Sequence, residues 1–219
     1  MRIGLFGGTF NPIHRCHLAI AAQTRDRLSL DRVVFIPSGD PPHKPSESLA
    51  QATHRFEMVR RAIESDPSFA ISDVEVRRAT KAYSIDTVRT LREQYGPAAE
   101  LFFIIGLDAF LELPSWRQAP DLLRSCHFVV VSRPGAEFLS LCDMPLLPAI
   151  ERASLAALDA RQQDRLDISI PNGIGLTLLR LPPCDVSASE IRHRLKNRIS
   201  LSDLLPAPVE SYIIRLGLY

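Results

Sequence analysis

The sequence lacks any apolar run approaching the roughly 20 residues that a membrane-spanning helix requires. It also lacks an excess of charge, because 26 Lys and Arg residues against 25 Asp and Glu residues leave a formal net charge of +1. Neither a nucleic acid nor a membrane is therefore expected as a partner, and any anionic ligand must be held by a local site. Residues 1–6 predict a strand rather than a cleavable leader, which favours a cytoplasmic protein.

Cysteine is scarce as well. The four cysteines lie far apart and show neither the paired spacing of zinc ligands nor the density of a disulfide scaffold: Cys16, Cys126, Cys142 and Cys184. We therefore expect reduced thiols. The trio His14, Cys16 and His17 is one ligand short of a zinc site, and no carboxylate cluster predicts a metal cage, so no protein-bound metal is expected.

Short β-branched and aromatic runs alternate with stretches of helical period. Strands are expected near residues 2–6, 33–36, 69–72, 101–105, 128–131 and 176–181. Because these runs are apolar along their whole length, they predict a doubly wound, Rossmann-like α/β fold, a parallel sheet with helices on both faces. One domain is expected over residues 1–219, with a C-terminal helical part from about residue 186. Residues 135–175 are interrupted by proline and glycine and predict a surface excursion with one helix near residues 149–158.

The segments that follow four of these strands are polar or rich in glycine. They are residues 7–9, 37–39, 106–108 and 132–134. Ligands of doubly wound sheets bind beyond the carboxyl ends of the strands, where such loops converge. The sequence therefore predicts the site at this edge of the sheet.

The strongest local signal is GGTFNPIHRCHL, residues 7–18, between the first strand and the first helix. Its two glycines let the backbone approach a ligand, and the positive end of the following helix points at the same place, so an anion is expected there. His14 and His17 are three residues apart, so both rings can share one helix face and bracket a phosphate. The alternative is a pair of surface or capping histidines.

This motif resembles the signature of the nucleotidylyltransferase superfamily, His-x-Gly-His. Within it, the chain is similar to bacterial nicotinate-nucleotide adenylyltransferases, through PPHK (41–44), YSIDTV (83–88), GLDAFLELPSW (106–116), SRPG (132–135) and VSASEIR (186–192). There are two departures. Cys16 stands where the family has glycine, and Ser189 stands where it has threonine.

The resemblance implies transfer of AMP from ATP to nicotinate mononucleotide, giving deamido-NAD and pyrophosphate in NAD biosynthesis. Mg²⁺ is the implied cofactor and would ride on the ATP phosphates and water. Such a displacement depends mainly on positioning and charge neutralisation. The implied catalytic residues are His14, His17 and Arg192. The implied ATP-binding residues are Gly7, Gly8, Thr9, Phe10, His14, His17, Gly106, Asp108, Ser187, Ser189 and Arg192.

The residues implied for mononucleotide binding are His43, Lys44, Thr87, Trp116 and Arg133. Several of these assignments have plain structural alternatives. Trp116 either stacks on the pyridine ring or anchors the core. Asp108 either binds a ribose or caps a helix beginning at Ala109. His43 and Lys44 either close over the mononucleotide phosphate or belong to a solvated loop.

Ser187 and Glu190 have the spacing of a helix capping box, a role that is compatible with phosphate binding. Thr87 is expected to help hold the pyridine carboxylate near a helix start. Cys16, at a helix N-terminus beside two histidines, is expected to have a lowered pKa and to be open to oxidation. Its side chain could also crowd the nucleotide.

Two other functions stay open. One is another nucleotidylyltransferase with a phosphopantetheine or polyol-phosphate acceptor. The other is a catalytically impaired nucleotide-binding homologue, because of Cys16. The expected partners are ATP and nicotinate mononucleotide, and a homo-oligomer is possible.

Overall fold

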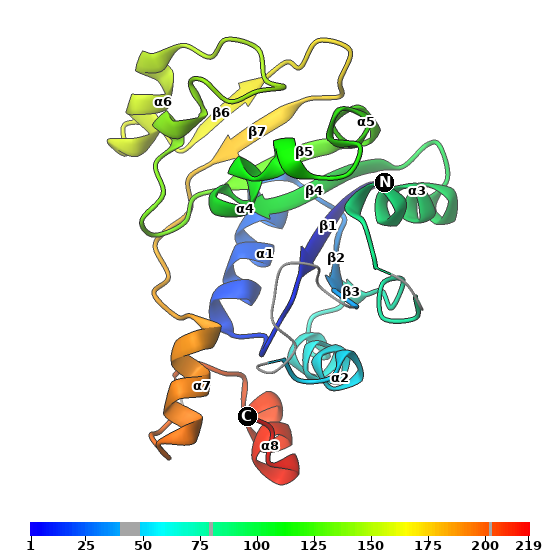
Figure 1. The fold of residues 1–219 in the computed structure, drawn as a ribbon, viewed down its shortest axis with the longest axis vertical. Helices are drawn as coiled ribbons and strands as arrows, with labels where there is room; N and C mark the ends of the chain where they lie inside the picture. The colour runs from blue at the N-terminus through cyan, green and yellow to red at the C-terminus, as the bar shows by residue number, and fades with distance from the viewer. Residues whose placement is uncertain (40–48, 79–80, 202) are drawn as a thin grey trace.

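The computed structural model describes residues 1–39, 49–78, 81–201 and 203–219. In this part of the chain seven strands form one sheet in the order β3-β2-β1-β4-β5-β7-β6 (Figure 1). The strands are β1 (Arg2–Gly8), β2 (Arg32–Pro37), β3 (Phe69–Ile71), β4 (Glu100–Gly106), β5 (His127–Val131), β6 (Arg165–Ile168) and β7 (Leu176–Leu179). The expected doubly wound α/β fold is confirmed.

All strand pairs are parallel except β6 with β7, which are antiparallel. The predicted strands are thus all parallel, and the antiparallel pair comes from one additional edge strand. Strand β6 was not expected, because its sequence Arg-Leu-Asp-Ile alternates and has exposed polar side chains. Alternation of this kind suits an edge strand with one solvated face, whereas the central strands are apolar throughout.

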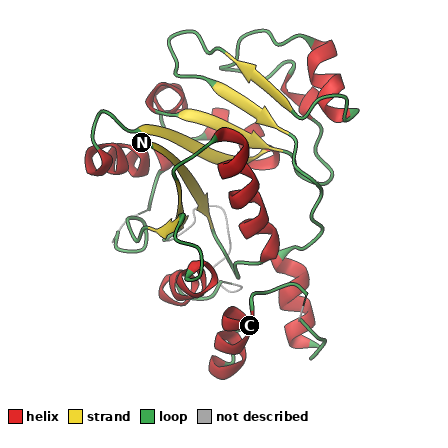
Figure 2. Ribbon diagram, turned by 180° about the vertical axis from the view of Figure 1, so that it is seen from behind, coloured by secondary structure: helices red, strands yellow, loops and turns green. Residues whose placement is uncertain are grey.

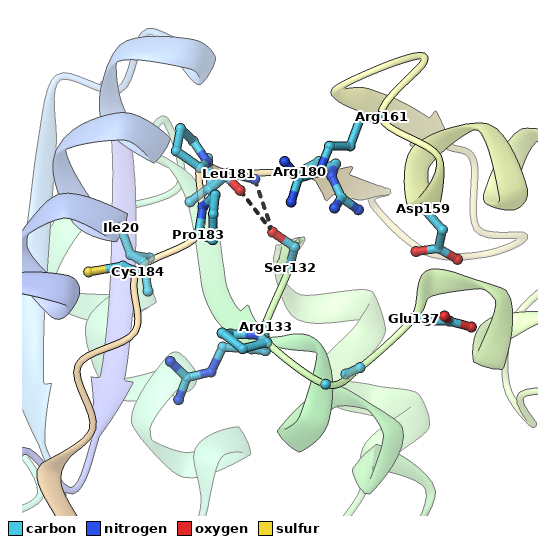
Figure 3. Close-up of a pocket in the computed structure, with 14 residues that line it drawn as sticks. Ile20, Ser132, Arg133, Glu137, Asp159, Arg161, Arg180, Leu181, Pro183 and Cys184 are labelled. Carbon is cyan, nitrogen blue, oxygen red and sulfur yellow. Dashed lines mark hydrogen bonds between the residues drawn. The ribbon is translucent and has the colours of Figure 1, made fainter. Parts of the chain in front are cut away.

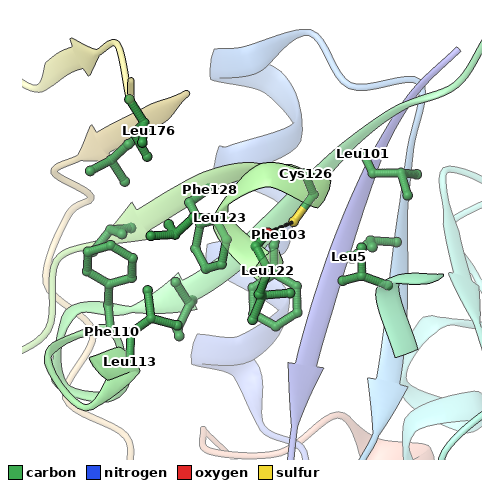
Figure 4. Packing of buried hydrophobic residues seen from close by; sticks show 14 of the residues in the cluster. Leu5, Leu101, Phe103, Phe110, Leu113, Leu122, Leu123, Cys126, Phe128 and Leu176 are labelled. Carbon is green, nitrogen blue, oxygen red and sulfur yellow. Dashed lines mark hydrogen bonds between the residues drawn. The ribbon is translucent and has the colours of Figure 1, made fainter. Parts of the chain in front are cut away.

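Helices cover both faces of the sheet (Figures 1 and 2). One apolar cluster joins the sheet to α1 (Arg15–Leu28), α2 (Ala52–Ile63), α7 (Ala188–Lys196) and α8 (Ala207–Leu216). The other joins it to α3 (Ser84–Tyr95), α4 (Leu107–Leu111), α5 (Ala119–Ser125), α6 (Arg152–Asp159) and the short helices η2 (Leu113–Ser115) and η3 (Phe138–Leu141) (Figure 4). No described helix has both the length and the apolar character needed to cross a bilayer.

Residues 135–175 are not the surface excursion that the sequence predicted. Phe138, Leu141, Leu155 and Leu158 are fully buried in the second cluster, so η3 and α6 form part of the core. Prolines and glycines separate these apolar residues into short groups, which hid the pattern. The expected helix near residues 149–158 is present as α6, but it begins three residues later.

The strand order reverses between β1 and β4. Strand β1 pairs with β2 on one side and with β4 on the other, so the chain winds away from this pair in both directions. In doubly wound sheets a ligand binds at this switch point, beyond the carboxyl ends of the strands. Here those ends are Gly7 and Gly8 on β1 and Gly106 on β4, as the glycine pattern predicted.

Candidate active site

The two histidines of the first motif lie against each other at the start of α1. His14 is the N-cap residue, and its backbone N–H donates to His17 Nδ1 at 3.3 Å. The ring centroids are 3.7 Å apart and the planes are inclined by 33°. The rings therefore share one face of the helix, as expected. No phosphate fits between rings this close, so an anion would meet their edges rather than be bracketed by them.

Burial controls the charge of His14. The side chain is 3% exposed, and burial together with the nearby Arg133 charge lowers its pKa to about 4. The ring is therefore neutral at neutral pH. Its Nδ1 atom is buried and has no hydrogen-bond partner among the described residues. A buried polar atom without a partner costs free energy, which an anionic or water ligand could recover.

The lowered pKa of His14 makes the stability depend on pH. An unfolded His14 takes up a proton near pH 6.5, whereas the folded ring does so only near pH 4, so stability is lost as the pH falls between these values. We expect the wild type to lose about 2–3 kcal/mol more than His14→Gln between about pH 7 and pH 4.5. Urea unfolding of both proteins measures this difference, and equal losses would contradict it.

The loop between β1 and α1 is shaped by Phe10. Its backbone has a φ of 47° and its ring, 2% exposed, packs edge-on against His17 with centroids 5.1 Å apart. The buried Phe10 ring therefore packs against the His17 ring. Only the Phe10 backbone can face an ATP molecule. A Cβ atom on Gly7 would meet nothing within 4 Å. The end of β1 thus faces open space, where a ligand can approach the backbone.

The start of α7 reaches the same loop. Arg192 Nη1 donates to the Asn11 carbonyl oxygen at 2.7 Å, and its Nη2 lies 3.4 Å from Ser189 Oγ. This contact joins positions 181 residues apart in the sequence. It brings Arg192 and Ser189 to the turn that precedes the histidine pair.

Ser187 is the N-cap residue of α7, and its side chain accepts the Glu190 N–H at 3.1 Å. The predicted cap is therefore confirmed. The reciprocal half of the capping box is not formed by the Glu190 side chain, which accepts from Arg194 Nε at 2.7 Å instead. The N-terminal half of α7 therefore presents two serine hydroxyls and one guanidinium.

Cys16 forms a disulfide with Cys184, with Cα atoms 5.6 Å apart. The expected reduced thiols are therefore wrong for this pair, and so is the expected reactive Cys16 thiol, since Cys16 is 1% exposed and bonded. Short cysteine spacings can be recognised in a sequence, whereas this disulfide joins residues 168 positions apart. Cys126 and Cys142 are free, as expected.

Asp108 and Arg133 meet beyond the ends of β4 and β5. Arg133 Nε lies 3.5 Å from Asp108 Oδ1, and both side chains are partly exposed. Helix α4 begins at Leu107 with Gly106 as its N-cap, so Asp108 is not the cap of a helix starting at Ala109. Because the Arg133 charge also acts on His14, Arg133 lies on the histidine side of the site.

A cavity of about 340 Å³ opens beside Arg133 (Figure 3). Arg161 and Arg180 lie together on its wall. Ser132, just after β5, accepts the Leu181 N–H at 3.0 Å and so joins the chain to the segment after the neighbouring strand β7. Its remaining lining comes from residues near the ends of β5 and β7 and from α1 and α6: Ile20, Pro134, Gly135, Ala136, Glu137, Asp159, Leu181, Pro182, Pro183 and Cys184. Sequence reasoning missed Arg161 and Arg180, since no motif surrounds them.

The Trp116 loop and the start of α3 are neighbours. Arg117 lies over the Tyr83 ring at 4.6 Å, which connects the Trp116 loop to α3. Trp116 is half-buried and meets Phe103 edge-on, with ring centroids 6.5 Å apart. One part of the indole therefore packs on the core while another part stays accessible.

Thr87 lies on α3 and is 1% exposed, and its hydroxyl donates to Glu75 Oε1 at 2.8 Å. In this structure the hydroxyl proton is thus directed at a carboxylate and not at the Trp116 side. His43 and Lys44 lie outside the described residues.

Arg55 is a site-forming residue that sequence reasoning missed. It is 2% exposed and donates to three backbone carbonyl oxygens: Thr9 at 2.8 Å, Gly39 at 2.7 Å and Ala50 at 3.0 Å. It therefore ties the loop after β1 to the loop after β2. The signal was present, since Arg55 lies four residues before the buried Val59 and so shares the core-facing side of α2.

Glu75 is half-buried near this arginine. Burial raises the pKa of its carboxyl, and the Thr87 hydrogen bond and the Arg78 and Arg55 charges oppose that rise. The Glu75 backbone also approaches the loop after β2, because a Cβ atom on Gly39 would overlap the Glu75 carbonyl oxygen. Glycine is therefore required at position 39 by close packing.

Comparison with known proteins identifies the family of this chain. The sequence model of the family described as cytidylyltransferase-like matches residues 5–194. A probable nicotinate-nucleotide adenylyltransferase from Pelobacter propionicus is 44% identical over 221 aligned residues, covering 100% of this chain and 98% of that protein. The corresponding protein from Geotalea daltonii is 46% identical over 220 aligned residues, with the same coverage.

Solved structures share the fold at low identity. The nicotinic acid mononucleotide adenylyltransferase of Plasmodium falciparum, complexed with NaAD, superposes with a TM-score of 0.73 at 18% identity, covering 100% of this chain and 97% of that one. The same protein complexed with APC gives a TM-score of 0.71. These likenesses support the arrangement of the sheet and helices.

Proposed function

The chain belongs to the nicotinate-nucleotide adenylyltransferase family, and on that premise we propose that its histidine pair and Arg192 hold one ATP while AMP passes to nicotinate mononucleotide. The products are deamido-NAD and pyrophosphate, and the reaction serves NAD biosynthesis. The observation that carries the proposal is the 2.7 Å hydrogen bond from Arg192 to the Asn11 carbonyl, which joins α7 to the loop before α1.

The reaction is an in-line displacement. An oxygen of the mononucleotide phosphate attacks the α-phosphorus of ATP, the bond from that phosphorus to the bridging oxygen breaks, and pyrophosphate leaves with the electron pair. His17 Nδ1 accepts the His14 N–H, so the proton of a neutral His17 lies on Nε2. That N–H donates to the α-phosphoryl oxygens, where negative charge develops.

The start of α7 receives the leaving pyrophosphate. Ser187, Ser189 and the first N–H groups of α7 supply donors, and the positive end of the helix favours an anion. Arg192 uses Nη1 for the Asn11 carbonyl and keeps further N–H groups for phosphate oxygens. Because the partners are in place before ATP binds, little reorganisation accompanies the displacement.

Mg²⁺ enters as part of the substrate MgATP. Within the described ranges no three His, Cys, Asp or Glu side chains lie close enough together to hold an ion. We therefore assign its ligands to the phosphates and to water, which suits the preference of Mg²⁺ for retaining several waters. The protein contributes hydrogen bonds to the phosphates around it.

The two nucleosides bind at different places in the site. Asp108 binds the ATP ribose, and the cavity beside Arg133 takes the rest of the adenosine. Trp116 stacks on the pyridine ring of the mononucleotide, with Thr87 near the pyridine carboxylate and His43 and Lys44 on the mononucleotide phosphate. We propose that Arg133 acts on the ATP side, because it lies beside Asp108 and close enough to His14 to lower its pKa.

We expect Trp116→Ala to raise the KM for nicotinate mononucleotide about ten-fold, because stacking of a base on an aromatic ring contributes about 1–3 kcal/mol. The KM for ATP should change little. Initial-rate kinetics with each substrate varied in turn measure both constants. Trp116→Phe is the matched control and should recover most of the affinity. If both KM values rise together and the melting temperature falls, Trp116 is a core anchor only.

The proposed function is tested by pyrophosphate release from a panel of donors and acceptors. ATP and CTP are each paired with nicotinate mononucleotide, nicotinamide mononucleotide, phosphopantetheine and a polyol phosphate. We expect the highest kcat/KM for ATP with nicotinate mononucleotide. A higher value for another pair would assign the chain another substrate, and ATP binding without pyrophosphate release would identify a catalytically impaired homologue.

We further propose that residues 1–219 act as a single domain in the cytoplasm. Both apolar clusters use the same sheet, and α7, from the C-terminal helical part, supplies Arg192 to the site formed by β1 and α1. Each copy of the chain supplies all the proposed catalytic residues itself. The arrangement is therefore compatible with a monomer and with a homo-oligomer.

A further inference from the structure

The disulfide joins the two helix starts that the proposed function assigns to one triphosphate. Cys16 lies in the first turn of α1, between His14 and His17. Cys184 lies three residues before Ser187, the N-cap of α7. The bond therefore restrains the distance between the histidine pair and the phosphate-holding start of α7.

The segment that carries Cys184 has few other restraints. Leu181 is held by the Ser132 hydroxyl at its beginning, and Ser187 caps α7 at its end. Between them, Pro182 and Pro183 are exposed and have no N–H to donate, and residues 182–186 of the described chain make no backbone–backbone hydrogen bond. The disulfide is thus the main covalent or hydrogen-bonded anchor of this segment.

We propose that the Cys16–Cys184 disulfide is a thiol–disulfide exchange site through which a dithiol reductant weakens ATP binding. The assignment of ATP as the ligand rests on the proposed function. In the oxidised protein the two helix starts are held together before ATP arrives. In the reduced protein they are linked by the Arg192 hydrogen bond to Asn11 and by side-chain packing, so ATP must order residues 182–187 when it binds.

The two cysteines differ in exposure, which favours one order of the exchange. Cys16 is 1% exposed, whereas Cys184 is half-buried and lines the cavity, with its sulfur directed toward α1 (Figure 3). A thiolate of the dithiol attacks Cys184 Sγ, the S–S bond breaks, and its electron pair goes to Cys16 Sγ. The positive end of α1 stabilises that leaving thiolate.

The second thiolate of the reductant then completes the reaction. It attacks the reductant sulfur of the mixed disulfide, which forms the oxidised reductant and releases Cys184 as a thiolate. Both cysteines take up protons to an extent set by pH. In total, two electrons pass from the dithiol to the protein disulfide, and an oxidised dithiol reverses the reaction.

We expect reduction of the disulfide to change the KM for ATP and to leave the KM for nicotinate mononucleotide nearly unchanged. Reduction with dithiothreitol should raise the KM for ATP about ten-fold, because ordering several residues on binding costs affinity, and should leave the KM for nicotinate mononucleotide within about two-fold. Saturating ATP should also slow the reduction, since adenosine in the cavity covers Cys184. Alkylation followed by mass spectrometry reports the redox state of Cys16 and Cys184 independently of activity.

The experiment compares three proteins, each oxidised and reduced. The wild type should respond as described. Cys184→Ser should have the reduced KM for ATP under both conditions. Cys142→Ser, which removes a free and half-buried thiol elsewhere, should respond like the wild type.

Calorimetry of ATP binding separates failure of this inference from failure of the proposed function. An ATP affinity that depends on the redox state, without pyrophosphate release, would support the proposed exchange site and contradict the proposed adenylyltransferase activity. Equal ATP affinities in the two redox states would overturn the exchange site. Loss of the circular dichroism signal on reduction would also overturn it, by making the bond a requirement for folding.

Discussion

His17→Asn should lower kcat by about a thousand-fold, because removing one donor that acts on developing charge costs about 10²–10³ in rate. The asparagine amide oxygen can take the place of Nδ1 and still accept the His14 N–H, which His17 accepts at 3.3 Å in the wild type. What it lacks is the Nε2–H at the far side of the ring. The substitution therefore removes the proposed phosphate donor while keeping the helix cap.

Steady-state kinetics and thermal unfolding together measure this effect. The melting temperature of His17→Asn should stay near that of the wild type, while kcat falls. His193→Asn, in the last turn of α7, is the matched control and should keep kcat within about two-fold. A kcat for His17→Asn close to that of the wild type would show that the His17 ring does not touch the reacting phosphate.

Arg55→Met should lower the free energy of unfolding by about 3–5 kcal/mol, the range found when one partner of a buried charged network is removed. The substitution leaves the carbonyl oxygens of Thr9, Gly39 and Ala50 without this donor. It also removes a positive charge near the half-buried Glu75 side chain. Because the same hydrogen bonds fix the loops after β1 and β2, the KM for both substrates should rise.

Arg60→Met is the matched control for this substitution. Arg60 lies on the same helix and pairs with Glu57 at the surface, with 44% of its side chain exposed. Exposed ion pairs contribute about 0–1 kcal/mol, so the control should be nearly neutral. Urea unfolding of the two variants decides the matter. Equal losses would mean that the buried guanidinium does not stabilise the loops as its hydrogen bonds indicate.

The fold could be predicted from the sequence where the apolar pattern is continuous. The central strands are apolar along their length, and the predicted strands near residues 33–36 and 101–105 match β2 and β4 to within one residue at each end. Residues 135–175 could not be predicted in the same way. There Phe138 and Leu141 lie in a short helix, and β6 alternates, so neither carries a long periodic signal.

The candidate site divides along similar lines. The glycines, the histidine pair and Ser187 could be located because each depends on a local turn or helix start. The partner of Cys16 could not, since the disulfide depends on which segments the fold brings together across 168 residues. Arg55 was missed for a related reason. The spacing to Val59 placed Arg55 on the core-facing side of α2, but its three carbonyl partners lie in separate loops that only the fold brings together.

The most direct test is a crystal structure with a non-hydrolysable ATP analogue and Mg²⁺. The α-phosphate should lie within hydrogen-bonding distance of His17 Nε2, while the β- and γ-phosphates contact Arg192 and the first turn of α7. A triphosphate bound to only one of these two helices, or bound elsewhere on the chain, would contradict the proposed reaction.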